Sequence, residues 1–404
     1  MLGHMNARER TILWHTCFGH FLSHFNMLAF PALVIPLTGL LGLDMAAVLG
    51  LSFWMYLLYG LMALPWGMVA DRIGVRVLFV VFYLGAGLSG LAAAAWSHNP
   101  FLLQLSLAGV GLFSAIYHPV GLGMISKEIR KVGLGMGFNG MFGNLGLACA
   151  PFVAGLVTWA WGPRAAFVSL GLINMCGAVF MLLWPLDLSG SRPETVEAKG
   201  NSSFKPFLIL LAAMMLGGIV YRGGTVILPA YFEVKNQALA DWLSAMAAGL
   251  LPPNMVATAT TSLIFLMGMA GQYLGGHVAQ RYDVRKTYLF FHAMTVPLAV
   301  LAGTLANLPL VVVVMAYFFF LLGMQPSENT LVGNLSPHRF RHAAFGFKFI
   351  LTFGVGSLAV KMVAAIQSGL SIEAVFPSLA VVSVLLVAAI LLLIHQTRPQ
   401  NASP

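Results

Sequence analysis

Ionisable side chains are scarce in the long apolar stretches of this sequence, and those few are the first candidates for chemistry. Five of them are the leading candidates, two histidines, two basic residues and one acid: His24, His118, Arg222, Lys348 and Glu328. An imidazole titrates near neutral pH, and a partly desolvated carboxyl group can exchange a proton there too. An arginine stays charged and binds carboxylate or phosphate through paired hydrogen bonds. The set therefore indicates proton exchange combined with recognition of a polar or acidic small molecule.

Each of these residues also has a structural interpretation, which the sequence leaves open. Arg222 and Glu328 could form a permanent ion pair, and the stem of Lys348 could carry its ammonium group toward the polar end of its stretch. A buried histidine can simply be a hydrogen-bonded packing residue. Three polar side chains are weaker candidates for the same site: Tyr117, Asn139 and Asn144.

A metal site is the alternative for the first apolar stretch. His20 and His24 are four residues apart and would share one helical face, and Met27 follows three residues later. Imidazole and thioether ligands suit copper. Methionine is also a general packing residue in apolar helices, so we expect no resident metal or cofactor and keep these three residues as the alternative.

Composition shows which elements must position these residues. Hydrophobic residues make up 59% of the chain and charged residues 8%, against roughly 25% charged in a soluble domain. Apolar runs of about 20 residues predict membrane-spanning helices. We expect an all-α membrane protein with twelve spans, near 11–36, 45–70, 76–96, 100–125, 133–159, 165–186, 205–232, 254–280, 286–305, 308–334, 341–367 and 372–396.

One long polar stretch divides these spans six and six. It covers residues 187–204, which we interpret as a cytoplasmic linker between an N-terminal bundle, 1–186, and a C-terminal bundle, 205–404. Most of the 21 basic residues fall in alternate connections, which places both termini in the cytoplasm. The net charge of +9 is then topological, and we expect no nucleic-acid partner.

The two predicted bundles repeat one another. The second span of each closes on a basic turn, and Gly67, Asp71, Arg72 and Arg76 in the first copy align with Gly276, Gln280, Arg281 and Arg285 in the second. Asp283 lies within the second turn. His24 and Arg222 each lie seven residues before a Pro-Ala pair. In duplicated transporters the substrate site lies near the midplane where the halves meet.

These basic turns have two interpretations. A compact turn of glycine, acid and arginine can act as a gate contact that breaks when the halves rock against each other. The gating candidates are Gly67, Asp71, Arg72, Arg76, Arg281 and Asp283. The alternative is a basic loop that only anchors a span in the membrane.

The turn at 67–76 resembles the signature of the major facilitator superfamily. The fifth span, with Gly143, Gly146, Pro151 and Gly155, is similar to the glycine-proline signature of antiporters in that superfamily, and these residues also favour close packing and a bend. Residues 19–24 and 109–119 resemble the fosmidomycin-resistance type of exporter. Those relatives carry an acid after the His-Pro pair, where this chain has Val120. The resemblance implies two pseudo-symmetric six-helix bundles, the major facilitator fold, with spans 1, 4, 7 and 10 lining the central cavity.

Together these patterns predict a transporter rather than an enzyme. We expect a proton-coupled antiporter of the inner membrane that exports a small polar or anionic compound, a drug or a metabolite. The alternatives are a proton symporter that imports an organic acid and a copper transporter. The expected partners are the lipid bilayer, protons and a small-molecule substrate, and we expect the protein to be a monomer.

Overall fold

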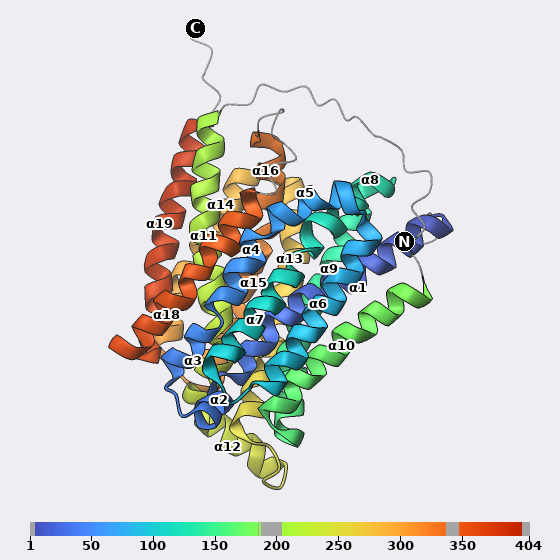
Figure 1. The fold of residues 1–404 in the computed structure, drawn as a ribbon. Helices are drawn as coiled ribbons and strands as arrows, with labels where there is room; N and C mark the ends of the chain where they lie inside the picture. The colour runs from blue at the N-terminus through green and yellow to red at the C-terminus, as the bar shows by residue number, and fades with distance from the viewer. Residues whose placement is uncertain (1–4, 185, 187–203, 337–346, 398–404) are drawn as a thin grey trace.

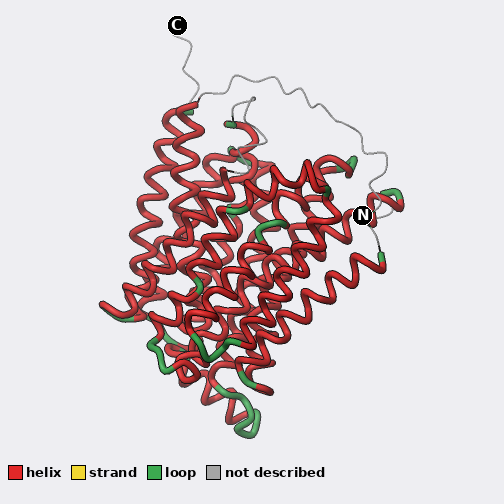
Figure 2. Tube along the Cα trace, viewed as in Figure 1, coloured by secondary structure: helices red, strands yellow, loops and turns green. Residues whose placement is uncertain are grey.

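The computed structural model describes residues 5–184, 186, 204–336 and 347–397, and all the regular structure in these ranges is helical (Figure 2). Within these described ranges, twelve segments are long and apolar enough to cross a membrane, as predicted. The helices are α1 Ala7–Ala29, α2 Val34–Leu41, α3 Met45–Leu51, α4 Phe53–Leu61, α5 Ala63–Ile73, α6 Val75–Ala95, α7 Pro100–Ser114, α8 Gly123–Glu128, α9 Val132–Trp161, α10 Pro163–Leu183, α11 Phe204–Lys235, α12 Gln237–Met246, α13 Pro253–Arg281, α14 Val284–Thr304, α15 Asn307–Gly323, α16 Gln325–Leu335, α18 Leu358–Gly369 and α19 Val375–Gln396.

Several spans are not regular along their whole length. A 3₁₀ segment at Phe30–Leu33 separates α1 from α2, and a π-helical turn at His118–Leu122 separates α7 from α8. Proline occupies an early position in both segments, where its missing N–H removes a hydrogen bond of the regular helix. A second π-helical turn, Ile350–Gly354, lies in the eleventh span. Such turns are frequent at functional sites because they turn side chains away from the regular helical position.

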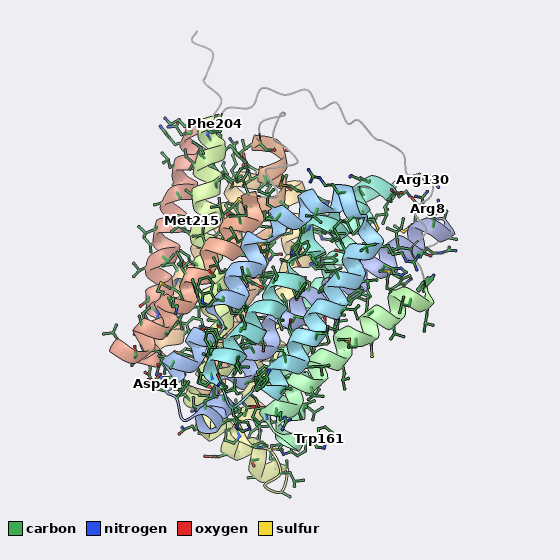
Figure 3. The ribbon with its side chains drawn as sticks, in the orientation of Figure 1. Arg8, Asp44, Arg130, Trp161, Phe204 and Met215 are labelled. Carbon is green, nitrogen blue, oxygen red and sulfur yellow. The ribbon has the colours of Figure 1, made fainter. Side chains whose placement is uncertain are left out.

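The two ends of the molecule differ in what they carry. The start of α1 and the end of α19 lie at the same end as α5, α8 and α16, whereas α2, α3 and α12 lie at the other (Figure 1). Arg8 and Arg130 are at the first end, and Asp44 and Trp161 at the second (Figure 3). An even number of spans returns the chain to its starting side, so we call these the terminal end and the far end.

The hydrophobic core shows how the halves meet. One large core cluster takes residues from both halves, for example Phe30, Leu107, Phe232 and Phe376. Two further clusters are each confined to one half, and their members lie between residues 5 and 186 or between 207 and 393. The shared cluster is built from far-end helix segments and the separate clusters from segments nearer the terminal end. The halves are therefore packed together at the far end.

Close helix packing between the halves depends on small residues. A Cβ atom on Gly155 of α9 would overlap the Thr258 side chain of α13, and one on Gly60 of α4 would overlap the backbone at Gly354. These contacts join the N-terminal half to the C-terminal half. The predicted linker, apart from its last residue, lies outside the described residues, so the division at 187–204 stays a prediction.

Candidate functional site

Three histidines from two spans of the N-terminal half gather near the middle of the molecule. His20 and His24 lie one turn apart on α1, and their Nε2 atoms are 3.0 Å from each other. His118 begins the π-helical turn of the fourth span. One ring nitrogen from each of the three lies within 4.8 Å of the others. Sequence spacing predicted the pair on α1, but only the fold brings His118 to it.

The neighbours of His20 determine which nitrogen carries its proton. Its Nδ1 lies 2.9 Å from the Asn139 carbonyl oxygen, which can only accept a hydrogen bond. The Nδ1 atom must therefore be protonated. In the neutral ring Nε2 is then an acceptor, so the Nε2–H of His24 donates to it. The His20–His24 contact thus holds one proton in the neutral state.

The rings around His20 are held by hydrogen bonds within the N-terminal half. Tyr117 stacks on His20 with ring centroids 4.9 Å apart, and the Tyr117 hydroxyl bonds the side chain of Asn139. Gly143 leaves room for the imidazole, because a Cβ there would lie 2.6 Å from its Cε1 and Nε2 atoms. Tyr117 and Asn139, two of the weaker candidates, therefore belong to this site as residues that position His20.

His118 joins the two halves. Its Nε2 atom lies 2.8 Å from the Tyr59 hydroxyl, which also bonds Ser23. Its ring stacks on Phe349 and Phe353 of the eleventh span, at 4.7 and 5.7 Å between centroids. The His118 Nδ1 atom is buried without a hydrogen-bond partner. His118 is thus seated between the halves with one ring nitrogen free.

Arg222 does not form the ion pair with Glu328 that the sequence left open. Its guanidinium carbon lies 3.8 Å from the centroid of the Tyr56 ring, a cation–π contact across the two halves. The side chain is buried, and its Nε and Nη1 atoms have no hydrogen-bond partner. Arg222 is also close enough to His24 for an electrostatic interaction. It is therefore a buried cation with free donors beside the histidines.

Glu328 pairs with Lys348 instead. The Lys348 ammonium lies 2.8 Å from Glu328 Oε1 and 2.5 Å from Asn329 Oδ1. Tyr288 of α14 donates to Glu328 Oε2 at 2.9 Å. Both charged side chains are buried, so Lys348 does not extend to the membrane surface. The physical reason is that a buried ammonium needs a nearby anion, and α16 supplies one.

Charge and burial together describe this group of residues. Of the five first candidates, only His24 is partly exposed, and His118, Arg222, Glu328 and Lys348 are buried among protein neighbours. Arg222 and Lys348 contribute two positive charges and Glu328 one negative charge. The site therefore has an excess positive charge when the histidines are neutral, which favours an anion.

Asn144 belongs to a different polar contact between the halves. Its amide donates to Gln272 of α13, and Gln272 donates to Gln325 of α16 at 2.6 Å. Gln325 precedes Pro326 in the tenth span as His118 precedes Pro119 in the fourth. The three amides form a chain from the N-terminal half to the helix that carries Glu328.

The same three histidines offer the donor atoms of a metal site, with His118 in addition to the predicted His20 and His24. A metal dication would come close to Arg222 and Lys348, which interact electrostatically with His24 and His118. Among the described residues, the cluster holds no carboxylate to offset that charge. The arrangement therefore fits protons and an anion better than it fits copper.

The predicted gating residues are spread over the terminal end. Gly67 faces Pro119, and Arg72, Arg76 and Arg281 are exposed. The side chain of Asp71 lies outside the described residues. Asp283 begins α14 as its N-cap and pairs with Arg285 at 2.5 Å, so in this conformation its ion pair lies within one half.

The Asp283 pair has a clear electrostatic signature. The hydrogen bond from Arg285 and two backbone N–H groups lowers the pKa of the Asp283 carboxyl to about 2. Arg285 also donates to the carbonyl of Thr397 at 2.6 Å, beyond the end of α19. These contacts tie the start of α14 to the last span.

The glycine and proline residues of the fifth span are packing residues in this structure. A Cβ on Gly146 would overlap the carbonyl of Phe21, and Gly143 and Gly155 meet His20 and Thr258. Pro151 is buried within α9. The span is therefore held closely against α1 on one side and α13 on the other.

Sequence reasoning missed the aromatic part of the site. Tyr56 and Tyr59 are three residues apart, which places both on one helical face, and that spacing was the available signal. Phe349 and Phe353 could not be distinguished from the many phenylalanines of the chain, because their role depends on the π-helical turn that follows Phe349.

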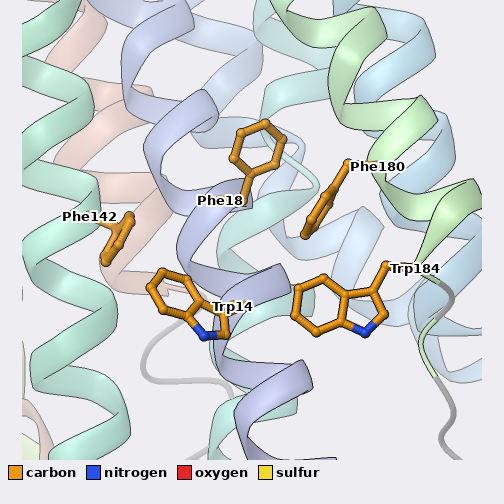
Figure 4. A pocket seen from close by; sticks show the side chains of 5 residues that line it. All are labelled: Trp14, Phe18, Phe142, Phe180 and Trp184. Atoms are coloured by element: carbon orange, nitrogen blue, oxygen red, sulfur yellow. The ribbon is translucent and has the colours of Figure 1, made fainter. Parts of the chain in front are cut away.

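A separate aromatic pocket of about 230 Å³ lies between α1, α9 and α10 (Figure 4). Its lining is almost entirely apolar: Trp14, Phe18, Phe142, Phe180 and Trp184. It offers an apolar surface and none of the ionisable groups described above.

Comparison with known proteins gives one family match. Residues 16–259 match the model of the Major Facilitator Superfamily. The "Probable L-galactonate transporter" of Escherichia coli (strain K12) is 26% identical over an alignment of 264 residues, which covers 59% of this chain and 54% of that protein. The chain thus spans about half the length of this curated relative.

Solved structures share the fold along almost the whole chain. A bacterial homologue of the human lysosomal transporter Spinster, inward-facing and occupied, has a TM-score of 0.73 at 15% identity and covers 99% of this chain and 100% of its own. A nucleoside transporter has a TM-score of 0.71 at 14% identity and covers 95% and 99%. These likenesses show the fold alone.

Proposed function

The chain belongs to the Major Facilitator Superfamily, and we propose that it transports a small organic acid together with protons by alternating access. The observation that carries this proposal is Arg222, a buried guanidinium with two free nitrogens beside the histidine cluster. A buried arginine without a carboxylate partner is a strong site for a carboxylate ligand, because two parallel hydrogen bonds can form at once. The likeness to a probable L-galactonate transporter supports an acid as the substrate.

The proposed proton carriers are the groups that can change charge beside Arg222. They are His24, His118 and Glu328. Adding a proton to any of them makes the site more positive, which favours binding of an anion. By reciprocity, the bound anion favours binding of the proton. Charge balance therefore supports cotransport when the substrate is an anion.

This argument bears on the direction of transport. The sequence predicted export by antiport, and the narrower resemblance to the fosmidomycin-resistance type of exporter pointed the same way. Antiport requires proton and substrate to oppose each other's binding, which suits a cationic or neutral compound. Antiport stays a prediction, and symport of an acid is the function that the charges support best.

The arrangement of the halves supports access from the terminal end in this conformation, since the shared core lies at the far end. We propose that the terminal end faces the cytoplasm, because the helix ends and connections described there carry the basic residues Arg72, Arg76, Arg130, Lys131, Arg281 and Lys286. The prediction that the protein acts as a monomer in the inner membrane is kept as part of this proposal.

A ligand-stabilisation screen tests the substrate class. We expect L-galactonate or another small sugar acid to raise the Tm of the purified protein, by mass action on the folded state. Arg222→Gln should abolish this shift without unfolding the protein. Arg164→Gln, at an exposed position of α10, is the matched control. The panel includes phosphonates, antibiotics and copper, and an unchanged acid response in Arg222→Gln would remove the guanidinium from the site.

Transport in proteoliposomes tests the coupling. We expect uptake of the acid to increase when the proton gradient is directed inward and to fall when an ionophore removes it. If an inward proton gradient drives the acid out of the vesicles, the sequence-based prediction of antiport is right and cotransport is wrong.

A further inference from the structure

His292 stands out among the buried histidines of the described chain. It lies in α14, is fully buried, and neither of its ring nitrogens has a hydrogen-bond partner. His15 of α1 is just as buried, but its Nδ1 and Nε2 atoms lie 2.8 and 2.6 Å from the carbonyl oxygens of Thr11 and Trp184. An unpaired buried imidazole costs stability relative to an apolar ring, so a role other than packing must account for it.

The neighbours of His292 connect it to the charged pair of the C-terminal half. Its ring centroid lies 4.7 Å from that of Tyr288, one turn earlier on the same helix. Tyr288 donates to Glu328, which also pairs with Lys348. Glu328 is close enough to His292 for an electrostatic interaction. A charge placed on His292 would therefore act directly on the Glu328–Lys348 pair.

The other side of the His292 ring is apolar. Gly217 of α11 faces it, since a Cβ there would lie 3.9 Å from His292 Cε1 and 3.8 Å from the Leu386 side chain of α19. Glu328 of α16 is thus the charged group that faces His292, with Lys348 beyond it, and Tyr288 is the titratable group on its own helix. Among the described ion pairs, the Glu328 carboxylate has Lys348 as its one partner.

We propose that His292 is a second proton-binding group, which on protonation competes with Lys348 for Glu328. One proton from the aqueous phase binds a ring nitrogen, forms an N–H bond and gives the ring one positive charge. The Glu328 carboxylate then has two cations, so its attraction for the Lys348 ammonium is shared. Lys348 is then released from Glu328 and becomes available as a second cation for an acid held by Arg222.

This inference rests on the proposed function, because it explains how a proton bound away from the substrate could strengthen binding of an acid. The two cations would be supplied by different helices, Arg222 from α11 and Lys348 from the eleventh span. Proton and acid would then be coupled through the Lys348 side chain without touching each other. The histidine cluster of the N-terminal half is not needed for this step.

His292→Phe is the sharpest test, because phenylalanine keeps the ring and removes both nitrogens. We expect the variant to be at least as stable as the parent protein and to retain acid counterflow, which requires no net proton movement. Uptake driven by a proton gradient should fall at least tenfold. The affinity for L-galactonate, or for whichever acid the screen identifies, should lose most of the increase that the parent protein shows as the pH is lowered from 7 to 4.

Two further variants keep the test decisive. His15→Phe is the matched control and should lower the Tm while leaving gradient-driven uptake of the folded fraction unchanged. His292→Gln carries the same prediction as His292→Phe if the phenylalanine variant does not accumulate. Gradient-driven uptake and pH-dependent affinity that match the parent protein in either His292 variant would overturn the proposal. Failure of the parent protein to bind any acid would overturn the proposed function, which is a separate outcome.

Discussion

The ion pair between Lys348 and Glu328 allows a quantitative test of how the C-terminal half is held together. The ammonium and carboxylate are 2.8 Å apart, and their side chains are 10% and 3% exposed. Removing one partner of a buried pair leaves an uncompensated charge, which costs about 3–5 kcal/mol. Removing both partners leaves no such charge. Lys348→Met and Glu328→Gln should therefore each be strongly destabilising, and the double variant should be much less so.

The expected size can be expressed as a change in Tm. At about 2 °C per kcal/mol, the value for larger proteins, each single variant should lower the Tm by about 6–10 °C. Glu328→Gln keeps an oxygen for Tyr288, which donates to it at 2.9 Å, so the lost charge dominates the change. The double variant should recover more than half of the summed loss, because the two residues are in contact.

Thermal unfolding of the detergent-solubilised protein, followed by tryptophan fluorescence, measures all three variants. Lys205→Met, at an exposed position of α11, controls for the loss of a lysine. Two results would refute the reasoning. One is a decrease below about 2 °C in each single variant, and the other is a double variant that shows the full sum of the single effects.

Two other perturbations have signs that follow from the structure. Gly143→Ala should weaken acid binding and lower the Tm, because its Cβ would lie 2.6 Å from the His20 ring. Gly140→Ala on the same helix meets nothing within 4 Å and should be neutral or stabilising by up to about 1 kcal/mol. Equal Tm values for both variants would contradict this expectation. Asp283 has a pKa lowered from 3.8 to about 2 by Arg285, so its stabilising contribution is complete above about pH 4 and is lost as the pH falls through 2. Asp283→Asn should therefore be less stable than the parent protein at neutral pH, and this difference in stability should disappear as the pH falls from 4 to 2. A difference in stability that is the same at pH 4 and pH 2 would show that the ion pair contributes nothing.

Much of the fold was predictable because hydropathy is a local property. Twelve apolar runs predicted the twelve spans, and the broken spans fall where Pro31 and Pro119 interrupt the hydrogen-bond pattern. Because charged residues are so few, the candidate site residues could also be identified from the sequence. In a chain with 8% charged residues, each buried ion is conspicuous in the sequence, and His118, Arg222, Glu328 and Lys348 all proved to be buried.

The sequence by itself thus determined that the protein lies in a lipid bilayer, how many spans it has and which few ionisable residues lie within them. Only the tertiary structure decided the partners. Lys348 forms an ion pair with Glu328, Arg222 makes a cation–π contact with Tyr56, and His118 lies beside the histidines of α1. The reason is geometric: a contact between two spans depends on the depth and rotation of both helices. Depth and rotation are fixed by close packing at glycines and by π-helical turns, and neither leaves a periodic signal in the sequence.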